Sequence, residues 1–247
     1  MSNNVVLITG GTGAIGSAMC RQFHSEGCMV VANCHPSDEE RSTQVIEALV
    51  KDRVEVMLQA FDVTDPEACA AAIADIESRL GPLSVVVNAA GITRDAKLTN
   101  LEPEQWNAVL RTNLDGVYNV TRPAIGPMTE RKYGRIINIS SVNGQRGQIG
   151  QTNYSAAKAG MTGFTKALAR EVARDGITVN SVSPGYVQSP MIQAVPEPVR
   201  EKIVKQIPVG RFAEPEEIAR AVSFLASTDS GYITGTDLSV NGGYHIG

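Results

Sequence analysis

Short apolar blocks alternate with longer stretches of helical periodicity along the whole chain. The blocks are rich in Val and Ile without an apolar/polar alternation, which is typical of strands covered on both faces in a parallel sheet. Strands that alternate with helices imply right-handed βαβ crossovers. No linker, repeat or low-complexity run interrupts the pattern, so we predict one α/β domain over 1–247. The expected strands are 5–9, 28–33, 54–61, 83–90, 134–140, 177–184 and 237–243.

The first block runs directly into a glycine turn and a helix, in the stretch "VVLITGGTGAIGSAMCRQF" (5–23). The turn has glycines at position 10, at position 13 or 11, and at position 16, which let the backbone turn sharply and approach a pyrophosphate closely. The helix after the turn offers N–H groups and a partial positive charge to the same group. A glycine motif between a strand and a helix predicts a dinucleotide site. The fold class is therefore a Rossmann-type doubly wound parallel sheet of seven strands with helices on both faces. A tight turn without a ligand is the alternative.

The end of the second strand indicates which dinucleotide binds. An acidic residue there would bind the adenosine ribose hydroxyls and repel a 2′-phosphate. The stretch "VVANCHPSDEER" (30–41) is uncharged through Cys34, and acidic residues begin only at Asp38, with Arg41 close behind. This favours NADPH, with Arg41 or backbone donors near the phosphate. The acidic residues 38–40 are explained equally well as the first turn of the next helix.

A polar site is predicted in the stretch "SSVNGQRGQIGQTNYSAAKAG" (140–160). Helical periodicity over 152–174 places Tyr154 and Lys158 one turn apart on one face. A nearby ammonium lowers the pKa of a phenol, and each unit requires about 1.4 kcal/mol of preferential stabilisation of the phenolate. Ser141, at the end of the fifth strand, would hydrogen-bond a substrate carbonyl oxygen where charge develops. An isolated Tyr/Lys pair is more often a surface contact, but its place after the glycine turn favours catalysis.

Composition excludes other classes of function. With a net charge of −4 and a pI of about 5.5, the chain lacks the excess of basic residues that is typical of a nucleic-acid-binding or membrane-surface protein. The start "MSNNVVLITGG" has no basic region and too short an apolar run for a signal peptide or membrane span, so we expect a cytoplasmic protein. Four cysteines and three histidines show no metal-ligand spacing, and we expect no metal and reduced, packed thiols.

These motifs, in this order, resemble the short-chain dehydrogenase/reductase family across essentially the whole chain. "TGGTGAIG" resembles its cofactor turn, "YSAAK" its Tyr-x-x-x-Lys, and "VNAAG" its Asn-Asn-Ala-Gly segment, with a slight departure. The resemblance implies catalysis by Asn113, Ser141, Tyr154 and Lys158. The residues expected to contact the cofactor are Gly10, Thr12, Gly13, Ile15, Gly16, Arg41, Asp62, Val63, Asn88, Ala89, Gly91, Tyr154, Lys158, Pro184, Gly185, Val187 and Ser189; the family usually has Thr at the last position.

Within the family, "NAAGITRD", "VSPGYV" and "VNGGYHIG" are most similar to the members that reduce 3-oxoacyl thioesters. The likeness implies reduction of acetoacetyl-CoA by NADPH to (R)-3-hydroxybutyryl-CoA for polyhydroxyalkanoate synthesis. It also implies a lid over the substrate at 188–212, here called the lid segment; a packed helical excursion without motion is the alternative. The expected substrate-binding residues are Asp95, Ser141, Gln148, Ile149, Gln151 and Tyr186.

Three other functions remain open. An acyl-carrier-protein thioester is the first alternative to the acyl-CoA substrate, and its acidic carrier would require a basic patch, for which Arg131, Lys132 and Arg174 are candidates. A reductase of a non-thioester ketone and an NADP-binding regulator without turnover are the others. The resemblance further implies a homotetramer joined through the helices at 104–130 and 152–174 and through the last strand.

Overall fold

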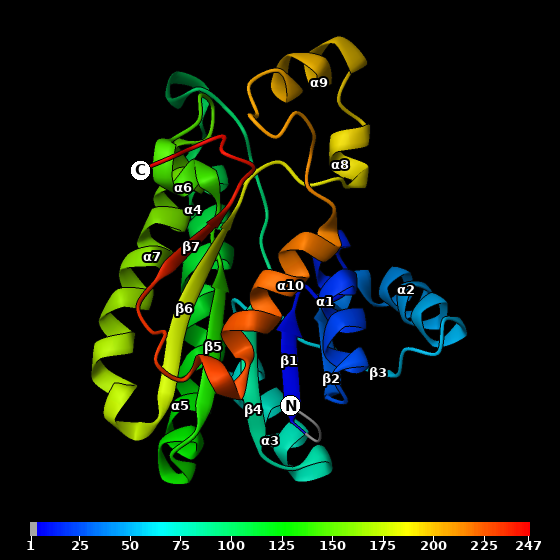
Figure 1. Cartoon of the computed structure of the whole chain (residues 1–247), viewed down its shortest axis with the longest axis vertical. Helices are drawn as coiled ribbons and strands as arrows, with labels where there is room; N and C mark the ends of the chain where they lie inside the picture. Colours follow the sequence, from blue (N-terminus) through cyan, green and yellow to red (C-terminus); the bar gives the residue numbers. More distant parts are fainter. Residues whose placement is uncertain (1–3) are drawn as a thin grey trace.

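A computed structural model describes residues 4–247. Residues 1–3, part of the stretch from which we expect no leader, lie outside the described residues. Within the described part, seven parallel strands form one sheet in the order β3-β2-β1-β4-β5-β6-β7 (Figure 1). This doubly wound α/β arrangement confirms the predicted fold class. The strands are β1 (Val5–Thr9), β2 (Met29–Cys34), β3 (Val56–Ala60), β4 (Leu83–Asn88), β5 (Gly134–Ile139), β6 (Ile177–Pro184) and β7 (Asp237–Val240).

The central strands are buried at almost every position, as predicted for a sheet covered on both faces, and polar residues of β5 and β6 such as Arg135 and Asn180 are buried too. Two strands at the edges of the sheet are shorter than expected. β3 covers 56–60 instead of 54–61 and is half-buried throughout, because it has only one neighbouring strand. β7 ends at Val240 instead of 243, because Gly242 and Gly243 adopt φ values of 62° and 82° and turn the chain out of the sheet.

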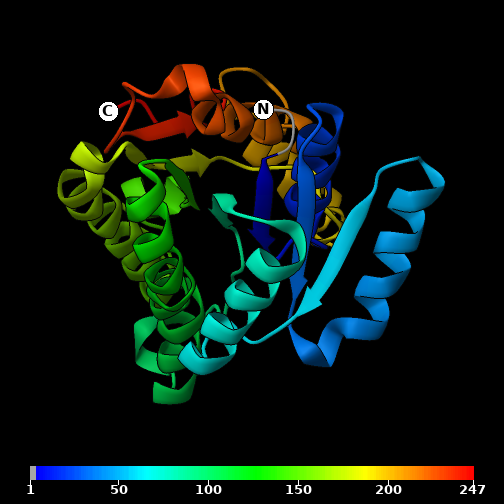
Figure 2. The same cartoon turned by 90° about the horizontal axis from the view of Figure 1, so that it is seen from below.

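Helices cover both faces of the sheet (Figure 2). One core joins one face of the sheet to α1, α2 and α10, and a second core joins the other face to α3, α5 and α7. The segment between α4 and α5 is a π-helix, Arg111–Asp115, so the helical stretch expected at 104–130 is continuous but irregular. The bounds are α1 (Ala14–Ser25), α2 (Glu39–Lys51), α3 (Pro66–Leu80), α4 (Pro103–Leu110), α5 (Gly116–Arg131), α7 (Thr152–Val172) and α10 (Pro215–Ala226).

Three helices begin at the Asp-Pro and Glu-Pro dipeptides that the sequence provides. The Asp65 carboxylate accepts hydrogen bonds from the N–H groups of Glu67 and Ala68 at the start of α3. Capping boxes open α4 and α10, with Glu102 and Glu214 as the N-cap residues. In each case proline occupies the first helical position, where no N–H is needed.

Three short helices lie beyond the carboxyl ends of the strands. α6 (Val142–Arg146) comes after β5, while α8 (Pro190–Gln193) and α9 (Glu197–Val204) come after β6 and lie in the lid segment. Figure 1 shows α8 and α9 as a projection above the rest of the molecule. They interrupt the regular alternation of strands and long helices. They lie beyond the carboxyl ends of the strands, where ligands bind in this kind of fold.

All four cysteines are buried. Burial raises the pKa of the Cys20 and Cys69 thiols to about 12 and that of Cys28 to about 11, so these thiols remain protonated and unreactive at neutral pH. Among residues 4–247, no group of three His, Cys, Asp or Glu side chains is placed to hold a metal ion. No helix in the same range is long and apolar enough to cross a membrane.

Candidate active site

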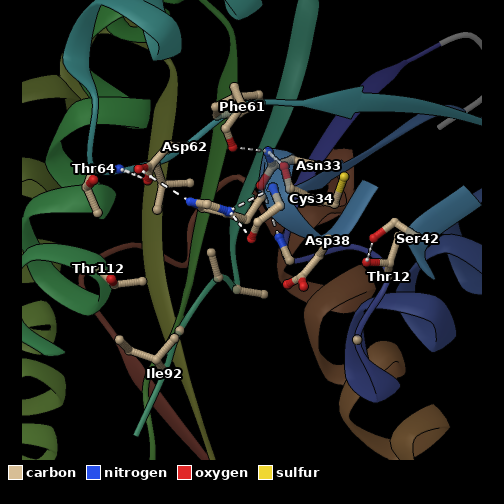
Figure 3. Close-up of a pocket in the computed structure, with 18 of the residues that line it drawn as sticks. Thr12, Asn33, Cys34, Asp38, Ser42, Phe61, Asp62, Thr64, Ile92 and Thr112 are labelled. Carbon is tan, nitrogen blue, oxygen red and sulfur yellow. Dashed lines mark hydrogen bonds and ion pairs between the residues drawn. The ribbon is translucent and has the colours of Figure 1, made fainter. Parts of the chain in front are cut away.

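A cleft of about 790 Å³ opens at the carboxyl ends of β1 to β4 (Figure 3). β1 pairs with β2 on one side and with β4 on the other, so the chain changes direction across the sheet at this point. The loops after these strands separate there and leave a crevice, which is the expected place for a ligand in a doubly wound sheet. Gly10, Thr12, Gly13, Arg41, Asp62, Val63, Ala89 and Gly91, all predicted cofactor residues, line the cleft.

The glycine turn is packed too closely to accept side chains. A Cβ on Gly16 would lie 2.3 Å from the Gly10 carbonyl oxygen, and a Cβ on Gly11 would lie 2.7 Å from the Ala32 Cβ. Gly10 has a φ of 64°. Gly13 begins α1 without a side-chain cap, so the first N–H groups of the helix are left to a ligand at the cleft. The turn therefore fits the pyrophosphate of a dinucleotide.

The side of the cleft after β3 presents an ordered carboxylate. The Asp62 Oδ1 atom accepts a hydrogen bond of 2.8 Å from the Thr64 N–H, and Oδ2 lies 3.5 Å from the His35 Nε2 atom. Burial works to raise the pKa of Asp62, but the hydrogen bonds from Thr64 and the interaction with His35 together lower it below its ordinary value. Asp62 is therefore an ionised acceptor at neutral pH, which suits the amino group of an adenine.

The side of the cleft after β2 carries no acidic residue on the strand itself. β2 ends at Asn33 and Cys34, both buried, and the Asn33 amide donates to the Phe61 carbonyl oxygen at 2.9 Å. Arg41 and Asp38 both line the cleft and are both exposed to solvent. A cation and an anion thus lie on the same wall, and the cation is the group that a 2′-phosphate would contact.

The predicted catalytic side chains converge from two segments. Ser141 comes after β5 and caps α6, where its Oγ atom accepts a 3.1 Å hydrogen bond from the Asn143 N–H. Tyr154 and Lys158 lie one turn apart on α7. The Lys158 Nζ atom is 5.6 Å from the centroid of the Tyr154 ring and donates a 2.6 Å hydrogen bond to the Ile139 carbonyl oxygen.

The pKa of Tyr154 is raised, where the sequence predicted that Lys158 would lower it. Removal of the phenol from water raises the pKa, and the hydrogen bond with Ser141 opposes that effect. Burial lowers the pKa of Lys158 to about 8. At neutral pH the phenol is therefore protonated and the amine is mostly charged.

Asn113 joins the catalytic group through the π-helix. Its side chain is fully buried and forms two hydrogen bonds with the backbone of Ile92, from Ile92 N–H to Oδ1 at 2.8 Å and from Nδ2 to the Ile92 oxygen at 2.9 Å. A Cβ on Gly91 would lie 3.3 Å from the Asn113 Oδ1 atom and 3.8 Å from the Lys158 Nζ atom. Gly91 thus allows Asn113 and Lys158 to approach each other, and π-helical segments are frequent at functional sites.

The predicted substrate residues form a connected surface next to Ser141. The Asn143 amide donates to Gln151 Oε1 at 2.9 Å, and the Gln151 amide donates to Asp95 Oδ2 at 2.9 Å. Gln148 lies in the same loop, and its carbonyl oxygen accepts from the Gln151 N–H. Ile149 is 85% exposed, which leaves an apolar side chain open to a ligand. Tyr186, after β6, packs against the rings of Phe212 and Tyr244.

The remaining predicted cofactor residues lie outside the lining of the cleft. Asn88 is buried and donates to Asn138 and Thr121, so it links β4 to β5 and α5. Ser189 caps α8, with its Oγ atom accepting from the Ile192 N–H at 3.3 Å. The other residues of this group pack within the turn, helix and strand ends where the sequence placed them: Ile15, Gly16, Tyr154, Lys158, Pro184, Gly185 and Val187.

The candidate basic patch is in the wrong place for a partner at the site. Arg131 and Lys132 end α5 immediately before β5 begins, so they lie at the amino ends of the strands, whereas the catalytic side chains lie beyond the carboxyl ends. Both are also paired, Arg131 with Glu77 at 2.9 Å and Lys132 with Asp175. Arg174 lies after α7 in a short 3₁₀ helix just before β6, at the same end of the sheet.

Comparison with known proteins decides the family. The family model described as enoyl-(acyl carrier protein) reductase matches residues 11–245. The chain belongs to the short-chain dehydrogenase/reductase family. An acetoacetyl-CoA reductase of Rhizobium meliloti is 50% identical over 99% of each chain, and one of Allochromatium vinosum is 49% identical over 97% of each. A 3-oxoacyl-(acyl-carrier-protein) reductase of Haemophilus influenzae is 41% identical over 100% of each.

As a short-chain dehydrogenase/reductase, the chain is an oxidoreductase that uses a nicotinamide cofactor.

Part of the lining of the cleft was not predicted from the sequence. Most of the unpredicted residues lie just after the carboxyl ends of strands, where the sheet topology could have located them. Ser42, on α2, gave no such signal; its hydroxyl lies 3.0 Å from the Thr12 hydroxyl. The unpredicted lining residues include Asn33, His35, Ser37, Ser42, Phe61, Thr64, Ile92 and Thr112.

Proposed function

We propose that this short-chain dehydrogenase/reductase reduces acetoacetyl-CoA with NADPH to (R)-3-hydroxybutyryl-CoA, which supplies polyhydroxyalkanoate synthesis. The observation that carries the proposal is the identity of about one half, over nearly the full chain, with acetoacetyl-CoA reductases. The cluster of Ser141, Tyr154 and Lys158 supports it, because the three side chains converge on one point beside an open polar loop.

The cofactor would lie across the carboxyl ends of the strands. When bound, it supplies a hydride to C3 of the acyl group. The glycine turn would hold its pyrophosphate, Asp62 its adenine and Arg41 its 2′-phosphate. The loop that carries Gly91 and the part of α7 that carries Tyr154 and Lys158 would surround the nicotinamide end, where Gly91 allows Asn113 and Lys158 to approach each other.

Tyr154 would donate the proton that the substrate oxygen requires. A phenol with a raised pKa holds its proton at neutral pH, which suits a donor in the direction of reduction. The Ser141 hydroxyl would hydrogen-bond the same oxygen and stabilise the charge that develops on it. The Lys158 ammonium, held against the Ile139 carbonyl, would stabilise the phenolate that remains. Asn113 would position this end of the site and carry the route by which the phenol regains its proton.

Selection of the substrate would depend on the loops around Ser141. The chain of hydrogen bonds from Asn143 through Gln151 to Asp95 presents polar groups to the thioester side, and exposed Ile149 presents an apolar one. The lid segment at 188–212 would close over the substrate and exclude water from the reacting carbonyl. A cytoplasmic homotetramer, joined through the long helices and the last strand, remains part of the proposal.

The residues at the end of β2 favour NADPH over NADH. Asn33 and Cys34 offer no carboxylate to repel a 2′-phosphate, and Arg41 is exposed on the wall of the cleft. Asp38 lies on the same wall and would oppose Arg41. Arg41 is the basic residue of the wall that follows β2, which makes it the residue to change.

The second candidate is reduction of a 3-oxoacyl group on an acyl carrier protein. The Haemophilus influenzae relative of that name favours it at lower identity. The location of Arg131, Lys132 and Arg174 counts against it, because an acidic carrier bound there would be at the opposite end of the sheet from Tyr154.

Initial rates of NADPH oxidation test the two candidates. The purified chain is assayed with acetoacetyl-CoA and with acetoacetyl-carrier protein, and each is repeated with NADH. We expect kcat/KM to be highest for acetoacetyl-CoA with NADPH, with (R)-3-hydroxybutyryl-CoA as the product by chiral analysis. A higher kcat/KM for the carrier-protein thioester would replace the first candidate by the second, and no turnover of either thioester would refute both.

A further inference from the structure

The residues after β7 form a folded tail that lies between the end of the lid segment and α6. Asn241 organises this tail, because its Oδ1 atom accepts from the Gly243 N–H and its Nδ2 atom donates to the His245 carbonyl oxygen, both at 2.9 Å. In Figure 1 the tail runs from β7 toward α6 and ends there. The tail is therefore an ordered element with contacts on both sides.

One side of the tail is packed against the end of the lid segment. The Val209 N–H donates to the Gly242 carbonyl oxygen at 3.1 Å. A Cβ on Gly242 would lie 2.9 Å from Ile207, and one on Gly243 would lie 3.0 Å from Pro208. Both glycines have positive φ values, so the close approach and the backbone conformation require glycine at both positions.

The other side of the tail reaches α6 through Tyr244. The Arg146 guanidinium, at the end of α6, lies 4.4 Å from the centroid of the Tyr244 ring. The same ring packs edge-on against Tyr186 at 5.4 Å, and its hydroxyl donates to Gln206 Oε1 at 3.4 Å. Tyr186 in turn packs against Phe212, at the end of the lid segment, at 6.0 Å. Tyr244 thus touches three segments that are far apart in the sequence.

α6 depends on such contacts for its position. It has five residues, and an isolated helix of that length is not stable in water. Ser141 caps its first turn, and Gly144 is packed so closely on α7 that a Cβ would lie 2.9 Å from the Lys158 Cβ. The Gln145 amide donates to Asp237 Oδ2 at 2.8 Å, which attaches α6 to β7. A displacement of α6 would therefore move Ser141 relative to Lys158.

We propose that Tyr244 is a positioning residue that connects the lid segment to α6 and thereby fixes Ser141 for the reaction. The Arg146 guanidinium and the Tyr186 ring hold the Tyr244 ring between them. Closure of the lid segment over a substrate would be transmitted to α6 through this ring. The expected effect on the reaction rests on the proposed function. The contacts of Tyr244 do not depend on it.

Substitution of the ring tests the proposal. Tyr244→Leu removes the cation–π contact, the edge-on ring contact and the hydroxyl bond to Gln206, and it keeps a smaller apolar side chain. We expect kcat/KM for acetoacetyl-CoA to fall about tenfold, because two aromatic contacts of this kind are lost. The Kd of NADPH should stay within about twofold, since the cleft at β1 to β3 does not include the tail. Tyr244→Phe, which keeps both ring contacts, is the matched control and should retain most of the wild-type kcat/KM.

A double-mutant cycle assigns the effect to the pair. Arg146→Met keeps the length of the side chain and removes its charge. If Arg146 acts through Tyr244, the double variant with Tyr244→Leu should lose less than the product of the two single losses. Multiplicative losses would show that the two residues act independently and would overturn the coupling.

Hydrogen exchange decides the inference even if the chain does not turn over acetoacetyl-CoA. In Tyr244→Leu we expect faster amide exchange in 142–150 and 196–209, with unchanged exchange in β1 and β2. Unchanged exchange in both segments would overturn the proposal. Faster exchange throughout the chain, together with a weaker affinity for NADPH and a lower melting temperature, would also overturn the proposal. It would show that Tyr244 contributes only to the stability of the whole fold. Inactive wild-type protein would instead refute the proposed function.

Discussion

The two halves of the ligand-binding edge use charged groups in opposite ways. In the half after β1 to β3, the proposed adenosine half, Asp38 and Arg41 are exposed to solvent on the wall of the cleft. In the half after β5, the proposed catalytic half, Lys158 is only 3% exposed and its ammonium is bound to a backbone carbonyl. Interactions of exposed charges are screened by water, while those of buried groups are strong and shift pKa values. Substitutions in the first half should therefore change discrimination between cofactors, and those in the second half should change the rate.

The largest effect that distinguishes the halves is expected for Ser141→Ala. The Ser141 hydroxyl bonds to Tyr154 and, in the proposed mechanism, would stabilise the reacting oxygen, so kcat should fall about 10²–10³-fold. Kd for NADPH should change little, because Ser141 is not among the residues that line the adenosine cleft. Stopped-flow binding and steady-state kinetics give the two quantities. Ser141→Thr, which keeps the hydroxyl, is the control; a loss of less than fivefold in Ser141→Ala would place the oxygen contact elsewhere.

The pH dependence of the rate tests the buried charge. Burial lowers the pKa of Lys158 from 10.5 to about 8, so its ammonium is present below pH 8 and is lost above it. We expect kcat at saturating substrate to fall up to about tenfold per pH unit above 8. The unfolded chain holds this proton up to a higher pH, so the cost of burying the ammonium falls and the folded state gains stability as pH rises from 8 toward 10.5. Loss of rate is therefore not unfolding caused by Lys158. A rate that is constant to pH 10 would show that the charge is not needed.

A smaller and more selective effect is expected for Arg41→Ala in the adenosine half. Loss of this exposed cation should weaken NADPH about tenfold and leave NADH nearly unchanged, because only NADPH carries the 2′-phosphate. Titration of both cofactors measures the difference, and Asp38→Asn, which removes the opposing charge, should shift it in the other direction. Equal weakening of NADPH and NADH by Arg41→Ala would move the phosphate contact to another residue.

Most of the fold was predictable because the core strands are short blocks rich in Val and Ile that alternate with helical stretches. The blocks at 5–9 and 177–184 match β1 and β6 without error. The error at the end of β7 has a local cause, since Gly242 and Gly243 turn the chain away, and the sequence alone does not show which glycines adopt positive φ. The pattern of Tyr154 and Lys158 on one face of a helix was predicted equally well, because a four-residue spacing fixes it.

The wall of the adenosine cleft was predictable only in part. Ser42 comes from α2 and Thr64 from the loop after β3, and neither belongs to a short motif. They meet because β3, β2 and β1 are neighbours in the sheet, which is a tertiary property. The direction of the Tyr154 pKa shift was missed for a similar reason, since it depends on how deeply the folded chain buries the phenol.

The most direct test of the division between the halves is a paired measurement on Tyr154→Phe. The substitution removes only the phenol oxygen, so the ring and its packing remain. We expect kcat with acetoacetyl-CoA to fall at least about 10²-fold, with the Kd of NADPH within about twofold of wild type. Substantial turnover in Tyr154→Phe would contradict the proton-donor role, and a parallel loss of NADPH affinity would contradict the separation of cofactor recognition from chemistry.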